Sequence, residues 1–312
     1  MKLFHLMFLL IAFPLVSCGQ TGNKQPSNKV YKPVLNAGYD LSAPDKVYIL
    51  PANLFEISGI TELDASTIAC VQDEHETVYI YDINKSQTIK QIFTGYDGDY
   101  EGIARVNKTI YVLRSDGVLT EIAGYDTEKF KRTTFVTGIP WKDNEGLCYD
   151  QKNNRLLIAP KETPKKDSGH KDFRLIYSFN LTTKKLLPEP VFRISLDEIK
   201  KFALDKKVKV PMKDKKEGKD PEPDIKFQIS AIEIHPVNGR LFVISGPERI
   251  LFVFDMKGHI FFLERLSGDL FKQPEGITFM KNGDMFISNE GKEKAPTLVR
   301  FNYKPSATGS GE

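Results

Sequence analysis

The sequence predicts an all-β fold, a β-propeller, and the main reason is a tripeptide that recurs along the chain. It consists of Glu or Ser, then Gly or Ala, then Ile or Leu, and successive copies begin 43, 44, 85 and 45 residues apart. A repeat of about 40–45 residues is the length of one propeller blade. The five copies are Ser58-Gly59-Ile60, Glu101-Gly102-Ile103, Glu145-Gly146-Leu147, Ser230-Ala231-Ile232 and Glu275-Gly276-Ile277.

A second observation is the regular alternation of short apolar segments and turns within each repeat. In the last repeat, residues 275–279, 285–289 and 297–301 are strand-like, and the turn at 281–284 contains Asn282-Gly283. Asn-Gly favours the positive φ angles of tight hairpins. Short strands separated by such turns predict an antiparallel meander, which is the structure of a blade.

The long step of 85 residues lies between the third and fourth copies of the tripeptide. It indicates either a blade without the motif or an insertion within a blade. Residues 195–204 are predicted to form a short helix capped by Ser195, and residues 205–223 are charged with little apolar content. These features favour a charged insertion at about 187–227. We therefore expect five blades, with six as the alternative.

The propeller is expected to span residues 45–304, with a disordered tail at 305–312. Residues 46–50 form a strand-like segment that has no earlier blade to join. We expect it to pair outside residues 298–303 of the last blade, because this closes the ring and removes an exposed sheet edge.

The N-terminus is predicted to be a lipoprotein signal peptide, residues 1–17, because a basic start and a short apolar run precede Leu15-Val16-Ser17-Cys18. Cys18 would carry the lipid, and the polar residues 18–44 would form a flexible tether to the membrane. An ordinary secretory signal is the alternative. No acidic residue follows Cys18 directly. We therefore expect a lipid anchor in the outer membrane of a bacterial cell envelope, facing the periplasm.

The composition argues against a nucleic-acid partner. The formal net charge is +3, and residues 200–226 alone contribute +4 through ten Lys and six acidic residues. The rest of the chain is about neutral and offers no basic face. Cys70 and Cys148 lie in apolar strand-like segments of different repeats, so both are expected to be buried free thiols. We expect a monomer.

Glu101, Glu145 and Glu275 occupy equivalent points of three blades, where the innermost strands begin. Three converging carboxylates would hold a hard cation such as Ca²⁺, which takes six to eight oxygen ligands. The alternative is that each Glu accepts backbone hydrogen bonds from a neighbouring blade. Without a cation the carboxylates would repel one another, and at least one would retain its proton.

A second set of polar residues follows the return strands at nearly equal distances from the tripeptide, so it should cluster at one rim. This rim could bind a polar ligand or could consist of solvated loop tips, and the sequence favours the second interpretation. Its members are Asp73, Glu74, Arg114, Asp116, Lys161, Glu162, Glu248, Arg249 and Glu290.

Several of these motifs together resemble the SdiA-regulated family, over about residues 45–304. They are the lipobox, residues 56–60, 71–74, 99–103, 144–150 and 273–277. The resemblance implies a five-bladed propeller, distantly similar to NHL-repeat propellers, and a calcium site. The basic insertion at 187–227 departs from the family pattern, which leaves any family surface site near it in question.

Two classes of function remain from the sequence. The favoured one is a membrane-tethered binding module with calcium at the channel mouth, whose ligand is an unknown small molecule or envelope protein. The alternative is a calcium-dependent hydrolase of a phosphate ester or lactone, which would need a water-activating base beside the metal. The chain contains no Gly-x-Ser-x-Gly motif, and no catalytic residue is assigned.

Overall fold

A computed structural model describes residues 36–305 apart from residues 76, 94, 96–97, 163–168, 215–219 and 293. The predicted signal peptide, Cys18 and residues 306–312 lie outside the described residues.

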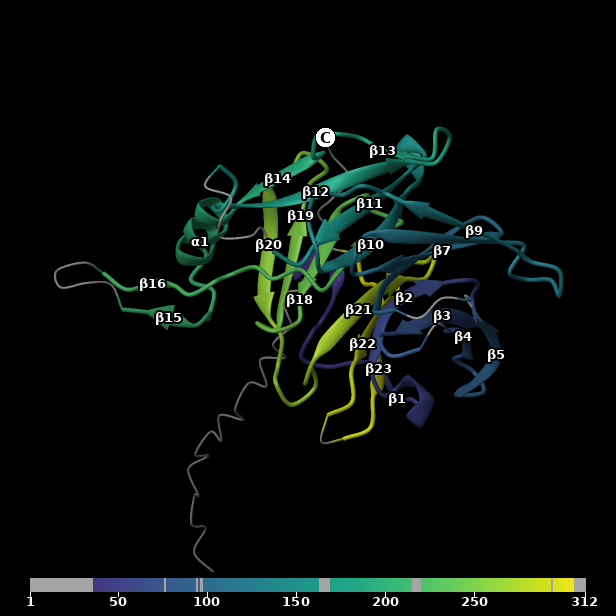
Figure 1. Cartoon of the computed structure of the whole chain (residues 1–312). Helices are drawn as coiled ribbons and strands as arrows, with labels where there is room; N and C mark the ends of the chain where they lie inside the picture. The colour runs from purple at the N-terminus through teal and green to yellow at the C-terminus, as the bar shows by residue number, and fades with distance from the viewer. Residues whose placement is uncertain are drawn as a thin grey trace, which may run out of the picture. The chain divides into compact units, whose positions relative to one another are not determined.

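Five antiparallel sheets form the blades of a propeller (Figure 1). Blade 1 contains β2 (Ile57–Glu62), β3 (Thr67–Gln72), β4 (Thr77–Asp82) and β5 (Gln87–Phe93); blade 2 contains β6 (Tyr100–Val106), β7 (Thr109–Arg114), β8 (Val118–Ala123) and β9 (Lys131–Val136); blade 3 contains β10 (Asn144–Asp150), β11 (Arg155–Pro160), β12 (Phe173–Asn180), β13 (Lys185–Leu186) and β14 (Phe192–Ser195). Blade 4 contains β17 (Ala231–Ile234), β18 (Leu241–Ser245), β19 (Ile250–Phe254) and β20 (Ile260–Arg265), and blade 5 contains β21 (Pro274–Phe279), β22 (Met285–Asn289), β23 (Thr297–Phe301) and β1 (Lys46–Ile49).

The five innermost strands, β2, β6, β10, β17 and β21, contact one another in that order, and β21 returns to β2. This closes the ring with five blades, which confirms the favoured prediction and rules out six. The first strand, β1, pairs with β23 from Lys46 opposite Arg300 to Ile49 opposite Thr297. The two ends of the propeller therefore share one sheet, as the sequence predicted.

The glycine of the repeated tripeptide allows neighbouring blades to approach closely. A Cβ atom on Gly102 would lie 2.6 Å from Cβ of Leu147 and 2.9 Å from the backbone oxygen of Glu145. A Cβ atom on Gly276 would lie 2.5 Å from the backbone oxygen of Ser58. No larger residue fits these places without a shift of the backbone.

A β-bulge lies at the same tripeptide in blades 1, 2, 3 and 5, and the sequence did not predict it. In blade 2, Tyr100 pairs with Arg114 and Gly102 with Leu113, which leaves Glu101 without a partner on β7. The same shift leaves Glu145 and Glu275 unpaired in blades 3 and 5. Because a bulge changes the direction of a side chain, it explains how these glutamates leave the regular pleat.

The predicted insertion begins with a blade strand. β14 pairs with β12, and the helix α1 (Leu196–Asp205) follows directly. The Ser195 side chain caps α1 by accepting a hydrogen bond from the Glu198 amide at 3.3 Å. Figure 1 shows α1 beside β14 and β20, with the short pair β15 (Met212–Lys213) and β16 (Glu222–Pro223) extending beyond it.

Cys70 and Cys148 are both buried free thiols, as expected. Within the part of the chain that the structure describes, no helix is long and apolar enough to cross a membrane.

Candidate functional site

The innermost strands run between two mouths of a central channel. We call the end that carries Glu101, Glu145 and Glu275 the carboxylate mouth, and the end that carries Glu62, Arg105 and Glu233 the far mouth. Between them lies a ring of buried aliphatic side chains, one from each blade. Its members are Ile60, Ile103, Leu147, Ile232 and Ile277. The cavities at the two mouths share no lining residue, so the two mouths are separate sites.

The structure brings the three predicted glutamates into one environment at the carboxylate mouth. Burial raises the pKa of Glu101 to about 9, with further contributions from the charges of Glu145, Asp99 and Glu275. Burial likewise raises the pKa of Glu145 to about 7 and raises that of Glu275. These shifts are the expected result when carboxyl groups converge in a place with little water.

Lys161 supplies the main counter-charge at this mouth. Its Nζ donates a hydrogen bond to Oε1 of Glu145 at 2.5 Å. The charges of Glu145, Glu275 and Glu101 all raise the pKa of Lys161. Lys161 was expected only on the rim, but the structure pairs its ammonium group with Glu145 and places it where the charges of Glu275 and Glu101 act on it.

The carboxylate mouth has some, but not all, of the features of a calcium site. A cavity of about 10 Å³, close to the size of one water or one ion, lies among the five tripeptides and is lined in part by Glu101, Glu145 and Ser230. The Ser230 hydroxyl is buried, lies beside Glu145 and Glu275, and forms no hydrogen bond of normal geometry. Carboxylate and hydroxyl oxygens suit Ca²⁺ in kind.

The positions of these side chains do not form a complete ligand set. Among the described residues, no group of three or more Asp, Glu, His or Cys side chains has the geometry to hold a metal ion. One oxygen of Glu145 is instead bonded to Lys161. Calcium binding here would require the carboxylates to move closer together and Lys161 to release Glu145.

Two of the predicted rim residues extend the carboxylate mouth. Burial raises the pKa of Asp73 to about 6, helped by the charges of Glu56 and Asp99. Burial and Glu56 raise the pKa of Glu290 to about 8, and the Gln273 side chain donates a hydrogen bond to Glu290. Carboxyl groups from four blades, which include Glu56 of the loop before β2, therefore gather at this end.

The other rim residues are engaged in local structure or exposed. Arg114 donates to both carboxylate oxygens of Asp116, at 3.1 and 2.5 Å. Glu248 accepts hydrogen bonds from the amides of Lys226 and Gln228 and from the Ser245 hydroxyl, which anchors the end of the insertion. The remaining three are Glu74, which is exposed, Glu162, whose charge acts on Arg174, and Arg249, which lies against Gly268.

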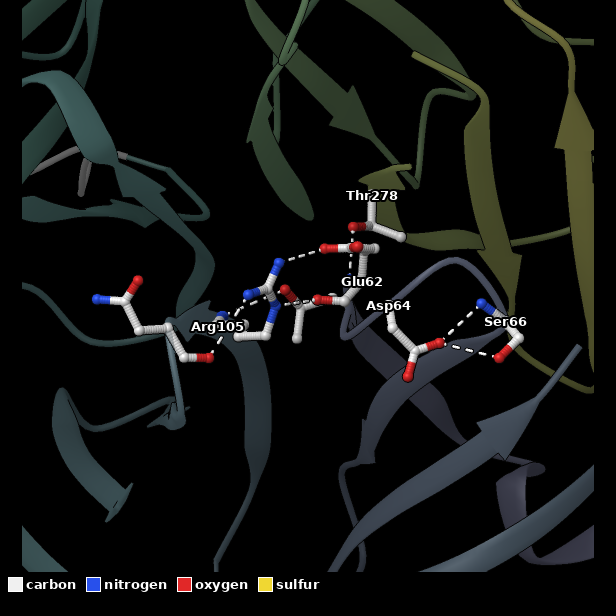
Figure 2. A network of polar contacts seen from close by, with 7 residues as sticks. Glu62, Asp64, Ser66, Arg105 and Thr278 are labelled. Atoms are coloured by element: carbon white, nitrogen blue, oxygen red, sulfur yellow. Dashed lines mark hydrogen bonds and ion pairs between the residues drawn. The ribbon is translucent and has the colours of Figure 1, made fainter. Parts of the chain in front are cut away.

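The far mouth contains a charged pair that sequence reasoning missed. Arg105 donates from Nε to the backbone oxygen of Glu62 at 2.7 Å and from Nη2 to Oε2 of Glu62 at 2.5 Å (Figure 2). The Thr278 hydroxyl accepts the Glu62 amide at 2.9 Å. These contacts link blades 5, 1 and 2.

Glu233 was also missed, although the sequence carries a signal for it. The residue after each tripeptide is Thr61, Ala104, Cys148, Glu233 or Thr278, so blade 4 alone has a charged side chain at this position. A comparison of the five repeats that included the residue after the tripeptide would have identified Glu233.

The fold and the repeated motif define a five-bladed β-propeller. A sequence model of the SdiA-regulated family matches residues 50–292, so the chain belongs to this family. No curated protein sequence matches the chain.

The structure is similar to several solved propellers. Glutaminyl cyclase from Myxococcus xanthus has a TM-score of 0.55 and 14% identity, over 84% of this chain and 96% of that chain. Streptogramin B lyase has a TM-score of 0.49 and 11% identity, over 82% and 97%. At these identities the likeness concerns the fold alone.

Proposed function

We propose that this protein is a lipid-anchored propeller of the cell envelope that binds calcium at its carboxylate mouth and presents that mouth to a ligand. The observation that carries the proposal is the excess of carboxyl groups there. Glu101, Glu145 and Glu290 have pKa values raised to about 9, 7 and 8. The folded protein thus holds protons on these groups near neutral pH, and a divalent cation would take their place.

Calcium fits the chemistry better than a softer metal does. The donors that the mouth offers are carboxylates and the buried Ser230 hydroxyl, and hard cations prefer such oxygens. The atom-sized cavity is large enough for one ion and too small for an organic substrate. This favours a binding module over the alternative, a calcium-dependent hydrolase of a phosphate ester or lactone.

Thermal unfolding with and without calcium tests the proposal. A cation that binds only the folded state stabilises it by mass action, so calcium is expected to raise the Tm of the native protein. Glu145→Gln, Glu101→Gln and Glu275→Gln each keep the shape of the side chain and lose its charge, so each is expected to weaken the response strongly.

Glu264→Gln is the matched control, because Glu264 is another half-buried carboxyl group with a raised pKa, on the outermost strand β20. Its calcium response should equal that of the native protein. Equal responses in all five proteins would show that the glutamates are structural and would remove calcium from the proposal. Turnover of a phosphate ester or lactone by the calcium-loaded protein would favour the hydrolase.

The anchor is tested separately with Cys18→Ala. The tether at residues 18–44 has no long apolar segment, so loss of the lipid is expected to move the protein from the membrane to the soluble fraction. A variant that stays with the membrane after a salt wash would contradict the lipoprotein assignment. Separation of inner and outer membranes would test the expected location in the outer membrane.

A further inference from the structure

The far mouth contains a cavity large enough for a small organic molecule. Its volume is about 190 Å³, and all five innermost strands or the turns that follow them contribute to its lining. For comparison, an apolar cavity of about 150 Å³ in another protein holds benzene. This cavity shares no lining residue with the small cavity of the carboxylate mouth, so its chemistry is independent of the proposed calcium site.

Glu233 breaks a pattern of small side chains around this cavity. The Thr61 hydroxyl accepts a hydrogen bond from the backbone amide of Arg105 in the next blade at 3.2 Å. The Thr278 hydroxyl likewise accepts one from the backbone amide of Glu62 in the next blade at 2.9 Å. Glu233 occupies the equivalent position in blade 4, but its Oε1 accepts the amide of its own neighbour Ile234 at 2.9 Å. Within the described part of the chain, Glu233 has no other hydrogen-bond partner. Its second carboxylate oxygen is therefore available to a ligand.

The charges around the cavity leave Glu233 uncompensated. Arg105 is bound to Glu62 through both its Nε and its Nη2, so this pair is neutral as a unit. Burial raises the pKa of Glu233 to about 8, while Glu62 raises and Arg105 lowers it by smaller amounts. Two other titratable residues line the cavity: Tyr149, and Lys281, which is exposed and whose charge does not shift the pKa of Glu233. Cys148, nearby, is a buried thiol. An ionised Glu233 would therefore have no ion-pair partner among the described residues.

We propose that the far mouth binds a small primary amine, whose ammonium group pairs with the free oxygen of Glu233. An ammonium has three donors and needs three acceptors. The free oxygen of Glu233 is one, and the hydroxyl oxygens of Thr61 and Thr278, which line the same cavity, can supply the other two. The class of ligand follows from one unmatched carboxylate among neutral acceptors, which attracts a cation and rejects an anion.

The surroundings indicate where the rest of such a ligand lies. Tyr149, Gln151, Ile234 and Pro236 line both this cavity and a larger hollow of about 760 Å³ between blades 3 and 4. Three charged residues line that hollow: Asp150 and Arg155, which are paired at 2.8 Å, and the exposed Lys152. The hollow therefore suits a body that carries no second positive charge.

Titration of the purified full-length protein with n-butylamine tests the proposal, with n-butanol and butyrate as probes of the same shape. Butylamine is expected to shift the backbone amide resonances of Glu233, Ile234 and Arg105, while butanol and butyrate leave them in place. Glu233→Gln keeps the bond to the Ile234 amide and loses the charge. It should weaken butylamine binding by about tenfold or more, the value of one charged hydrogen bond. Glu264→Gln, in the same blade, should bind as the native protein does.

A second measurement on the native protein does not depend on a variant. Glu233 is mostly protonated at pH 7 when free and must ionise to pair with an ammonium, so binding should release close to one proton. Affinity should rise about tenfold from pH 6 to pH 7 and level off above pH 8. Binding of butanol as tight as that of butylamine, unchanged affinity in Glu233→Gln, or the absence of proton release would each overturn the proposal.

Discussion

The two mouths of the channel are ends of the same five strands, yet they treat buried charge in opposite ways. At the far mouth, the guanidinium of Arg105 donates hydrogen bonds to both the carboxylate and the backbone oxygen of Glu62, so the ion pair is complete. At the carboxylate mouth, the single ammonium of Lys161 bonds one glutamate and acts on two others. A complete ion pair holds neighbouring blades together. Carboxylates without enough counter-charge can instead bind a cationic ligand. Glu233 is the exception at the far mouth, because its carboxylate has no ion-pair partner among the described residues.

The comparison predicts the largest loss of stability when the ion pair of Glu62 and Arg105 is broken. Glu62→Ala leaves the guanidinium of Arg105 without its partner, and the Glu62 side chain is only 8% exposed. We expect the free energy of unfolding to fall by about 3 kcal/mol, measured by urea denaturation. A loss below about 1 kcal/mol would show that the pair does not hold the blades together.

The carboxylate mouth should instead reveal itself through pH. Its glutamates have pKa values raised above those of the unfolded chain, so the folded state holds protons that the unfolded state has lost. Stability without calcium is therefore full below about pH 4.5 and falls as pH rises toward 9. A shift of the Glu101 pKa from 4.5 to about 9 corresponds to about 5 kcal/mol over pH 5 to pH 9, and solvent screening of this partly exposed group reduces the expected loss to about 2 kcal/mol. Glu101→Gln should flatten the profile, and a profile identical to that of the native protein would contradict this.

Lys161 provides a smaller test of the same mouth. Lys161→Met removes the cation that favours ionised Glu145, so we expect a loss of about 1 kcal/mol at neutral pH and a steeper fall with rising pH. Calcium no longer competes with an internal ammonium in this variant, so its Tm should respond more strongly to calcium. Lys161→Arg, which keeps the charge, is the control. A weaker calcium response in Lys161→Met would contradict the view that the two cations compete.

The smallest effect is expected at the rim. The Asp116 side chain is 51% exposed and that of Arg114 is 23% exposed, so their pair lies at the surface. Asp116→Ala should change the free energy of unfolding by at most about 0.5 kcal/mol, measured under the same conditions as Glu62→Ala. A larger loss would place the rim with the structural pairs instead of the solvated loops.

The repeated tripeptide predicted the blades because its cause is local and periodic. Gly102 and Gly276 recur where backbones approach closely, and the first strand completes the last blade, as the sequence predicted. The same spacing brought Glu101, Glu145 and Glu275 to one mouth. The sequence could predict that these three glutamates lie at the same end of the channel, because the repeat fixes the position of each residue within its blade.

The partners of individual side chains were less accessible from the sequence. The bulge that redirects Glu101 depends on pairing with β7, and the bond from Lys161 to Glu145 depends on the position of a loop. Neither leaves a periodic trace. Glu62 and Arg105 lie at the same point of adjacent blades, but their pairing is visible only once the blades are set side by side.

The pairing of β1 with β23 also governs the order in which the protein can fold. Lys46 lies opposite Arg300, so the last sheet joins residues from almost opposite ends of the chain. Each earlier blade can form from one continuous stretch, but this sheet has to wait until the whole chain is made. Contacts of such sequence separation form slowly, because a long loop must close first. A chain cut before Thr297 would leave Tyr48 without its sheet and β22 with a bare edge, a state prone to aggregation rather than a propeller of lower stability.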